Sequence, residues 1–128
     1  MLVDTDIVSY FYRRDTRAAG YEPHLTGRTL FISFMTVAEL YKWPFERNWT
    51  ETKKQGLVQY LRNYTVLPYD DPLAWSWAEL VSKTCRGRPM SFQDSWIAAT
   101  ALRHGMPIVT HNRRHFESVP GLTVISES

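Results

Sequence analysis

SFQDSWIAATALRHGMPIVT, residues 91–110, encodes a helix and the strand that follows it, and this pairing decides the fold class. Ser91 predicts a helix start, because a serine side chain accepts hydrogen bonds from the first backbone amides of a helix. Gly105 and Pro107 predict the helix end, since glycine adopts the left-handed backbone that closes a helix and proline cannot continue one. The apolar residues 107–110 then predict a buried strand.

The same alternation of strand and helix extends over the rest of the chain. Further short apolar runs predict strands at 1–3, 30–33, 65–69 and 122–126. Helical spacing of apolar residues predicts amphipathic helices over 50–64, after a cap at Thr50, and over 71–85, whereas glycines and a proline predict an irregular helix and loop at 14–29. Strands that alternate with helices form parallel sheets. We therefore expect an α/β protein, a three-layer α/β/α sandwich around a parallel sheet of about five strands.

Length and composition predict one folded domain over residues 1–128. Hydrophobic residues make up 44% and charged residues 22% of the 128 residues, which is typical of globular proteins and excludes a disordered chain. The apolar runs are much shorter than the roughly 20 residues of a membrane span, and no signal peptide is recognisable, so we expect a cytoplasmic protein. The single cysteine, Cys85, cannot form an internal disulfide, and we expect it to be a core or loop residue. The net charge of +2 is too small to identify nucleic-acid binding.

Three carboxylates lie at the end of a predicted strand or near the start of a predicted helix. Asp4 ends the first strand, Glu39 comes just after the second, and Asp94 lies in the first turn of the helix that begins at Ser91. Because right-handed crossovers bring the helix starts of such a sandwich to the carboxyl edge of the sheet, we expect the three side chains to meet there.

Each acid also has a structural interpretation. Thr36-x-x-Glu39 and Ser91-x-x-Asp94 match the capping box, with Thr36 as the cap of the helix that carries Glu39. Asp6 could cap a helix that begins at Ile7. Taken singly, the acids are as well explained by helix capping as by chemistry.

Taken together, the three carboxylates favour a metal site. Two like charges about 4 Å apart repel by roughly 4 kcal/mol at an effective dielectric constant near 20, so a cluster of acids needs a cation or raised pKa values. Oxygen ligands without cysteine or histidine favour Mg²⁺ or Mn²⁺. Acidic pockets that hold these ions mainly carry out phosphoryl transfer and phosphodiester hydrolysis.

Three stretches of the chain also resemble a known family. MLVDTDIVSYF, ISFMTVAELYKW and FQDSWIAATALRHGMPIVTHNRRHFESVPGLTVI resemble, in this order, the signature stretches of PIN-domain proteins, specifically the VapC toxins of bacterial toxin–antitoxin pairs. The resemblance covers both ends and the second strand–helix unit, and little between about 45 and 85. It implies a Mg²⁺- or Mn²⁺-dependent ribonuclease that cleaves RNA to inhibit translation. It also implies a homodimer that is held inactive by a small cognate antitoxin, VapB-like in type.

The resemblance assigns roles to residues of this chain. Asp4, Glu39 and Asp94 match the catalytic and metal-binding acids of the family, and Thr110 and Asn112 match its supporting polar positions. His115 stands where the family often has a fourth acid, which favours one firmly held metal over two. A histidine there could hydrogen-bond a metal-bound water, contact phosphate, or favour Mn²⁺.

Other residues keep two interpretations. Asp6 is either a supporting residue that caps the first helix and orients its neighbours or a direct metal contact. The arginines Arg86, Arg88, Arg113 and Arg114 are either solvated surface residues or contacts to RNA or to the antitoxin. Trp43, Trp49 and Trp75 form part of a dimer or antitoxin groove, or are aromatic residues partly covered within the monomer.

Two rival functions are also compatible with an acidic edge. One is a catalytically weak PIN-like module that binds RNA or protein, since the fourth acid is missing. The other is a phosphatase-like domain, but it would need a nucleophilic aspartate with a nearby lysine, and the predicted strand ends carry no lysine.

Overall fold

The structure is a computed structural model that describes residues 1–84 and 90–128. Its centre is a sheet of parallel strands in the order β3-β2-β1-β4-β5, as the alternation of strands and helices predicts. The strands are β1 (Leu2–Val3), β2 (Phe31–Ser33), β3 (Thr65–Leu67), β4 (Ile108–Val109) and β5 (Val124–Ile125). Because the chain runs outward from β1 through β2 to β3 and then returns to place β4 on the other side of β1, the strand order reverses between β1 and β4.

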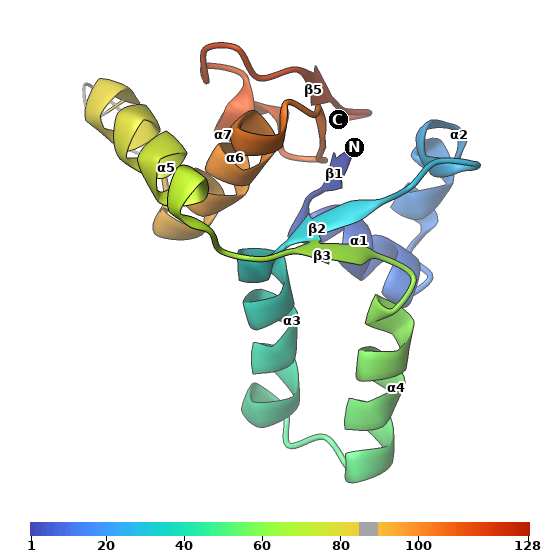
Figure 1. Ribbon diagram of the computed structural model, residues 1–128. Coiled ribbons are helices and arrows are strands. Elements are labelled where there is room, and N and C mark those ends of the chain that lie inside the picture. The colour runs from blue at the N-terminus through green and yellow to red at the C-terminus, as the bar shows by residue number, and fades with distance from the viewer. Residues whose placement is uncertain (85–89) are drawn as a thin grey trace.

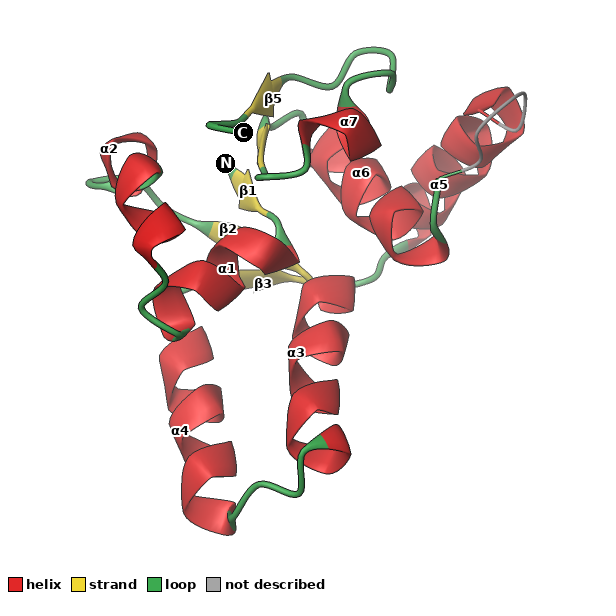
Figure 2. Cartoon of the chain, turned by 180° about the vertical axis from the view of Figure 1, so that it is seen from behind, coloured by secondary structure: helices red, strands yellow, loops and turns green. Residues whose placement is uncertain are grey.

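Helices cover both faces of this sheet, so the predicted three-layer sandwich is confirmed (Figures 1 and 2). The α-helices are α1 (Thr5–Tyr12), α2 (Glu22–Leu25), α3 (Phe34–Glu46), α4 (Glu51–Leu61), α5 (Asp71–Thr84), α6 (Phe92–His104) and α7 (Arg113–Phe116), and a 3-10 helix η1 spans Thr16–Gly20. In Figure 1, α3 and α4 run side by side and extend away from the sheet, while α5, α6 and α7 form a separate group.

Alternating side chains of the short strands build two hydrophobic cores. Val3, Ile32 and Val109 join the core formed with α1, η1, α2, α3 and α4. Leu2 and Ile108 point to the opposite face and join the core formed with α5, α6 and α7. Since successive side chains of a strand point to opposite faces, strands of only two or three residues can serve both cores.

Most predicted boundaries are confirmed. The Thr50 side chain caps α4 by accepting a hydrogen bond from the backbone amide of Lys53, and Ser91 caps α6 in the same way through Asp94. Gly105 closes α6 with a φ of 62°, the left-handed conformation that its position predicts. The region 14–29 consists of short helical pieces, as its glycines and proline predict.

Two capping predictions are wrong. Ser33, not Thr36, caps α3, because the helix begins directly after β2 and Thr36 is already helical. Asp4, not Asp6, caps α1, because that helix begins directly after β1 at Thr5. Pro44 does not break α3, which continues to Glu46; the proline ring is buried, so its packing offsets the backbone hydrogen bond that it cannot donate.

The tryptophans divide between the core and the surface. Trp77 and Trp96 stack with ring centroids 4.8 Å apart, as their positions on core faces predict. Trp75 is 72% exposed, and Trp43 and Trp49 are half-buried. Cys85, together with the two arginines at 86 and 88, lies outside the described residues. In the part of the chain that the structure describes, no helix has the length and apolar character to cross a membrane.

Candidate active site

Asp4 lies where the strand order reverses, the position at which parallel α/β sheets bind ligands. It follows β1, caps α1 and is only 5% exposed. Its Oδ1 accepts a hydrogen bond from the Thr5 amide at 2.8 Å, and its Oδ2 accepts one from the Thr110 hydroxyl at 2.7 Å. Thr110 follows β4, the neighbour of β1 in the sheet, so the sheet itself joins the first acid to the predicted supporting threonine.

Glu39 reaches the site from the second turn of α3 and is held by a chain of hydroxyl groups. The Thr5 hydroxyl donates to Glu39 Oε1 at 2.9 Å and lies 2.9 Å from the Thr36 hydroxyl. Ser33 in turn donates to the Thr36 hydroxyl at 3.3 Å. Since each hydroxyl has one proton and an ionised carboxylate only accepts, the protons all point from Ser33 toward Glu39.

Asp94 enters from the first turn of α6, and its backbone amide donates to the Ser91 side chain at 3.1 Å. Its carboxylate meets His115 of α7, whose Nδ1 lies 2.9 Å from Asp94 Oδ2. The histidine at the position of the family's fourth acid therefore contacts the third acid directly, with its side chain still 53% exposed.

Asp6 supports the loop that follows β4. Its Oδ2 accepts hydrogen bonds from the His111 backbone amide at 3.0 Å and from the Asn112 side-chain amide at 2.9 Å. The Asn112 backbone amide also donates to the Thr110 hydroxyl at 3.0 Å. Asp4 and Asp6 thus bind the same loop. Asp4 contacts Thr110, and Asp6 contacts His111 and Asn112.

A cavity of about 300 Å³ collects these side chains. Its walls come from the ends of β1 and β4 and from α1, α3, α6 and α7. The described residues that line it are Asp4, Thr5, Asp6, Ser9, Tyr10, Arg13, Glu39, Lys42, Trp43, Asp94, Asn112 and His115. The three predicted acids therefore share one cavity, whereas Arg113 and Arg114 are exposed on α7 and do not line it.

The electrostatics of the cavity show an excess of negative charge. Burial, followed by the charge of Asp6, raises the pKa of Asp4 well above its ordinary value. Burial also raises the pKa of Asp6, although hydrogen bonds from His111 and Ile7 oppose this. The pKa of Glu39 is raised by burial and by Asp94, against the hydrogen bond from Thr5. These carboxylates are thus more costly to ionise here than in water, and a cation would relieve that cost.

Five cavity residues are not predicted from the sequence: Thr5, Ser9, Tyr10, Arg13 and Lys42. Thr5 has a local signal, since it stands between the two acids of the first helix turn. Lys42 follows Glu39 by three residues, so a helix places both on one face. For Arg13 the signal is its position just after the last turn of α1, which has meaning only once α1 is placed beside α3.

Comparisons with known proteins identify relatives of this chain. A family model described as the PIN domain matches residues 1–122. Two curated relatives are the ribonuclease VapC1 of Haemophilus influenzae strain R2866, 28% identical over 94% of this chain and 92% of that protein, and the ribonuclease VapC4 of Mycobacterium tuberculosis, 31% identical over 86% and 81%. The solved structure of VapBC-1 from nontypeable Haemophilus influenzae matches with a TM-score of 0.82 and 25% identity over 98% of this chain and 96% of that chain. With its acids on the carboxyl edge of a 3-2-1-4-5 sheet and a family match over nearly its whole length, this chain belongs to the PIN domain family.

Proposed function

We propose that this chain is a VapC-type toxin, a divalent-metal-dependent endoribonuclease that hydrolyses RNA phosphodiester bonds and thereby inhibits translation. The observation that carries the proposal is the convergence of Asp4, Glu39 and Asp94, from three separate elements, on one cavity. The ribonuclease names of the curated relatives support the same activity. We also propose that residues 1–128 form one PIN domain, which a single cooperative unfolding transition in calorimetry would test.

The donor set of the cavity fits a hard divalent ion, Mg²⁺ or Mn²⁺. Within the described residues, Glu39 Oε2 and Asp94 Oδ1 accept no protein hydrogen bond, and both carboxylates line the cavity. Among the described residues, no three His, Cys, Asp or Glu side chains already form a metal-site group, and Thr110, Thr5 and His115 each contact one carboxylate oxygen of the three acids. The proposed ligands Asp4, Asp94 and Glu39 would therefore have to adjust when the ion binds.

Charge balance favours one ion over two. Four carboxylates line the cavity together with two side chains that are always cationic, Arg13 and Lys42. A single divalent cation makes the formal charge of these groups zero, whereas a second ion would leave an excess of positive charge. His115, which replaces the family's usual fourth acid by a group that is neutral or positive, points the same way.

In the proposed reaction the protein's own groups position and polarise the reactants. When bound, the divalent ion offsets charge on the phosphate and lowers the pKa of an attacking water. Asp4 is oriented by hydrogen bonds from the Thr5 amide and the Thr110 hydroxyl, and its carboxylate lines the cavity. Glu39, oriented by Thr5, either binds the ion or orients the water through its second oxygen. Asp6, Thr110 and Asn112 support this arrangement through the hydrogen bonds described above, and His115 does so through its contact with Asp94.

The partners that we propose are an RNA substrate, a second copy of the chain and a small VapB-like antitoxin. The names of several solved relatives include the VapB partner, for example VapBC from Salmonella typhimurium, with 25% identity and a TM-score of 0.82. Arg86, Arg88, Arg113 and Arg114 remain proposed contacts to RNA or to the antitoxin. The two described ones, Arg113 and Arg114, lie on α7 outside the cavity, where a long polymer or a protein could reach them.

RNA cleavage by the purified protein tests the proposal. We expect wild-type protein to cut RNA in the presence of Mg²⁺ or Mn²⁺ and to lose this activity in EDTA. Asp4→Asn should lower the cleavage rate by more than the roughly 10- to 100-fold that loss of an outer-shell partner costs a metal site. Asp71→Asn, which changes an exposed acid in the first turn of α5, is the matched control and should cut normally.

Two outcomes would contradict the proposal. Cleavage that persists in EDTA would exclude a metal nuclease. Cleavage by Asp4→Asn at the wild-type rate would show that the cavity is not the active site. A correctly folded wild-type protein that binds RNA without cutting it would favour the catalytically weak PIN-like module instead.

A further inference from the structure

Two cationic side chains, Arg13 and Lys42, line the same cavity as the four carboxylates. We propose that this pair, here called the basic rim, binds phosphates of single-stranded RNA beside the scissile bond and so determines on which side of the cavity the RNA backbone runs. The inference rests on the proposed ribonuclease function and adds to it the location of the substrate.

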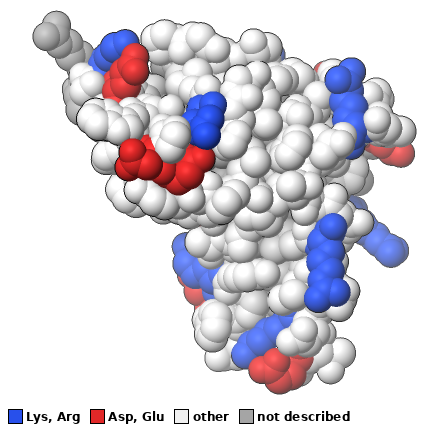
Figure 3. All heavy atoms as spheres, viewed as in Figure 1, with Lys and Arg blue, Asp and Glu red and all other residues white. Residues whose placement is uncertain are grey.

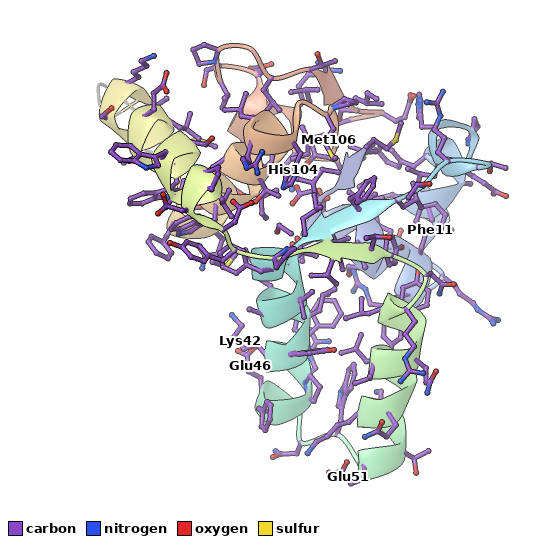
Figure 4. All side chains as sticks on the ribbon, viewed as in Figure 1. Phe11, Lys42, Glu46, Glu51, His104 and Met106 are labelled. Carbon is purple, nitrogen blue, oxygen red and sulfur yellow. The ribbon has the colours of Figure 1, made fainter. Side chains whose placement is uncertain are left out.

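Lys42 is placed beside the acids by helix geometry. It lies three residues after Glu39 on α3, and its charge is one of the influences that lower the pKa of Glu39. Figure 4 shows Lys42 and Glu46 on the side of α3 that faces away from α4. The Lys42–Glu46 pair is 4.0 Å long and both side chains are more than half exposed, so this ion pair is weak and Lys42 can turn to another anion.

Arg13 has no acidic partner within ion-pair distance among the described residues. It follows the last turn of α1 and is exposed. The nearest acid along the chain, Asp15, is occupied by Arg17, which binds it through two hydrogen bonds of 2.7 and 2.9 Å. Arg103 and Lys83, by contrast, each have a carboxylate partner, Asp70 and Glu79. An arginine that lines an anion-processing cavity without such a partner is well suited to a phosphate.

Both cations of the cavity come from helices that pack against each other. Arg13 and Lys42 belong to the end of α1 and to α3, which also supply Asp6 and Glu39, whereas Asp94, Asn112 and His115 come from α6 and from the start of α7. A polyanionic backbone that enters the cavity therefore meets its arginine and lysine only where α1 and α3 line it. Trp43, next to Lys42, also lines this side, and an aromatic ring beside cations is the pattern that binds single strands.

The charges on the face that Figure 3 shows do not form one basic patch. Figure 3 shows one face of the molecule, on which basic side chains are scattered and several stand next to acidic ones. With a net charge of only +2, the chain cannot rely on a general positive field to hold RNA. Localised cations at the cavity would then contribute a large share of the affinity.

RNA binding, measured apart from cleavage, tests the basic rim. Fluorescence anisotropy of a labelled single-stranded RNA would be recorded over a range of salt concentrations, with every protein carrying Asp94→Asn so that the RNA stays intact. We expect Arg13→Gln with Lys42→Gln to weaken binding on the order of tenfold and to reduce the slope of log K against log salt by about 1.4, or about 0.7 per lost phosphate contact. Arg62→Gln with Lys83→Gln removes the same charge at two exposed positions outside the cavity and should leave the salt slope nearly unchanged.

The outcomes separate the basic rim from the proposed function. In one outcome, wild-type protein cuts RNA while the Arg13→Gln, Lys42→Gln variant keeps the salt slope of the control. This result would contradict phosphate binding by the basic rim and leave the proposed ribonuclease activity intact. If the rim variant loses affinity for the antitoxin while its RNA binding is unchanged, Arg13 and Lys42 belong to a protein interface and the proposal is also wrong. Wild-type protein that neither binds nor cuts RNA overturns both.

Discussion

His115 Nδ1 lies 2.9 Å from Asp94 Oδ2, so a side chain of α7 contacts the carboxylate that α6 contributes to the active-site cavity. At the position where the resemblance implies a fourth acid, this chain has an imidazole that contacts the third acid. The histidine adds no negative charge to the cavity, and its contact occupies an oxygen that a metal ion would otherwise find open.

Replacing this histidine by an acid should reverse both effects. His115→Asp should lower the metal-free stability by roughly 1 kcal/mol, because a half-exposed contact is lost and a like charge is added. The same change should increase the affinity for Mg²⁺, since it adds an oxygen ligand. Thermal unfolding in EDTA and titration calorimetry with Mg²⁺ would measure the two effects. His115→Ala removes the contact without adding charge, and it should not increase Mg²⁺ affinity. Equal Mg²⁺ affinities of His115→Asp and His115→Ala would contradict the prediction that an acid at position 115 adds a metal ligand.

The hydroxyl chain predicts a role for Thr5 in positioning Glu39. Thr5→Val keeps the shape and β-branching of the side chain but removes the donor to Glu39 Oε1. We expect RNA cleavage to fall by about 10- to 100-fold, the usual cost of losing an outer-shell partner, while the melting temperature changes little. Thr5→Ser retains the hydroxyl and should restore most of the rate. If Thr5→Val and Thr5→Ser cleave RNA equally fast, the hydroxyl does not position Glu39.

The raised pKa values predict how stability depends on pH without metal. Asp4, Asp6 and Glu39 have pKa values above their ordinary values, chiefly because of burial, so the folded state binds protons more tightly than the unfolded state. Their contribution to the free energy of unfolding is therefore present at low pH and lost as pH rises through the folded pKa values. In EDTA, the melting temperature should increase when pH is lowered from about 7 to about 5.

Asp4→Asn is the control for this pH dependence, because the amide does not ionise. We expect the variant to be at least as stable as wild type near pH 7 and to gain less on acidification. A wild-type melting temperature that decreases steadily from about pH 7 to about pH 5 would show that other titratable groups determine the pH dependence of stability.

Metal binding should stabilise the fold by an amount that grows with the ratio of free ion concentration to dissociation constant. A ligand at about 100 times its dissociation constant adds roughly 2.7 kcal/mol to the free energy of unfolding. Mg²⁺ or Mn²⁺ should therefore raise the melting temperature of wild-type protein, and EDTA should reverse the rise. Asp94→Asn should lose this response and Asp71→Asn should retain it. A shift of equal size in Asp94→Asn would place the ion elsewhere.

Local sequence signals account for the secondary structure and for the acids. The caps at Thr50 and Ser91 and the left-handed Gly105 act within one helix turn, so the sequence alone determined where α4 and α6 begin and where α6 ends. The errors at Asp6 and Thr36 have one cause. β1 and β2 pass directly into helices, so Asp4, just after β1, and Ser33, the last residue of β2, are the caps, and each helix begins earlier than the spacing of its polar residues suggests.

Only the tertiary structure decided which polar side chains meet. Thr5 with Glu39, Asp4 with Thr110, and Asp94 with His115 join different elements, and no periodicity of a single segment predicts such pairs. The same holds for Arg13 and Lys42, which become cavity residues because α1 packs beside α3. The sequence by itself determined which residues can bind a metal and which edge of the sheet carries them, since local capping and right-handed crossovers follow from backbone sterics. The contacts among those residues depend on the packing of helices from both halves of the chain, which is a long-range property.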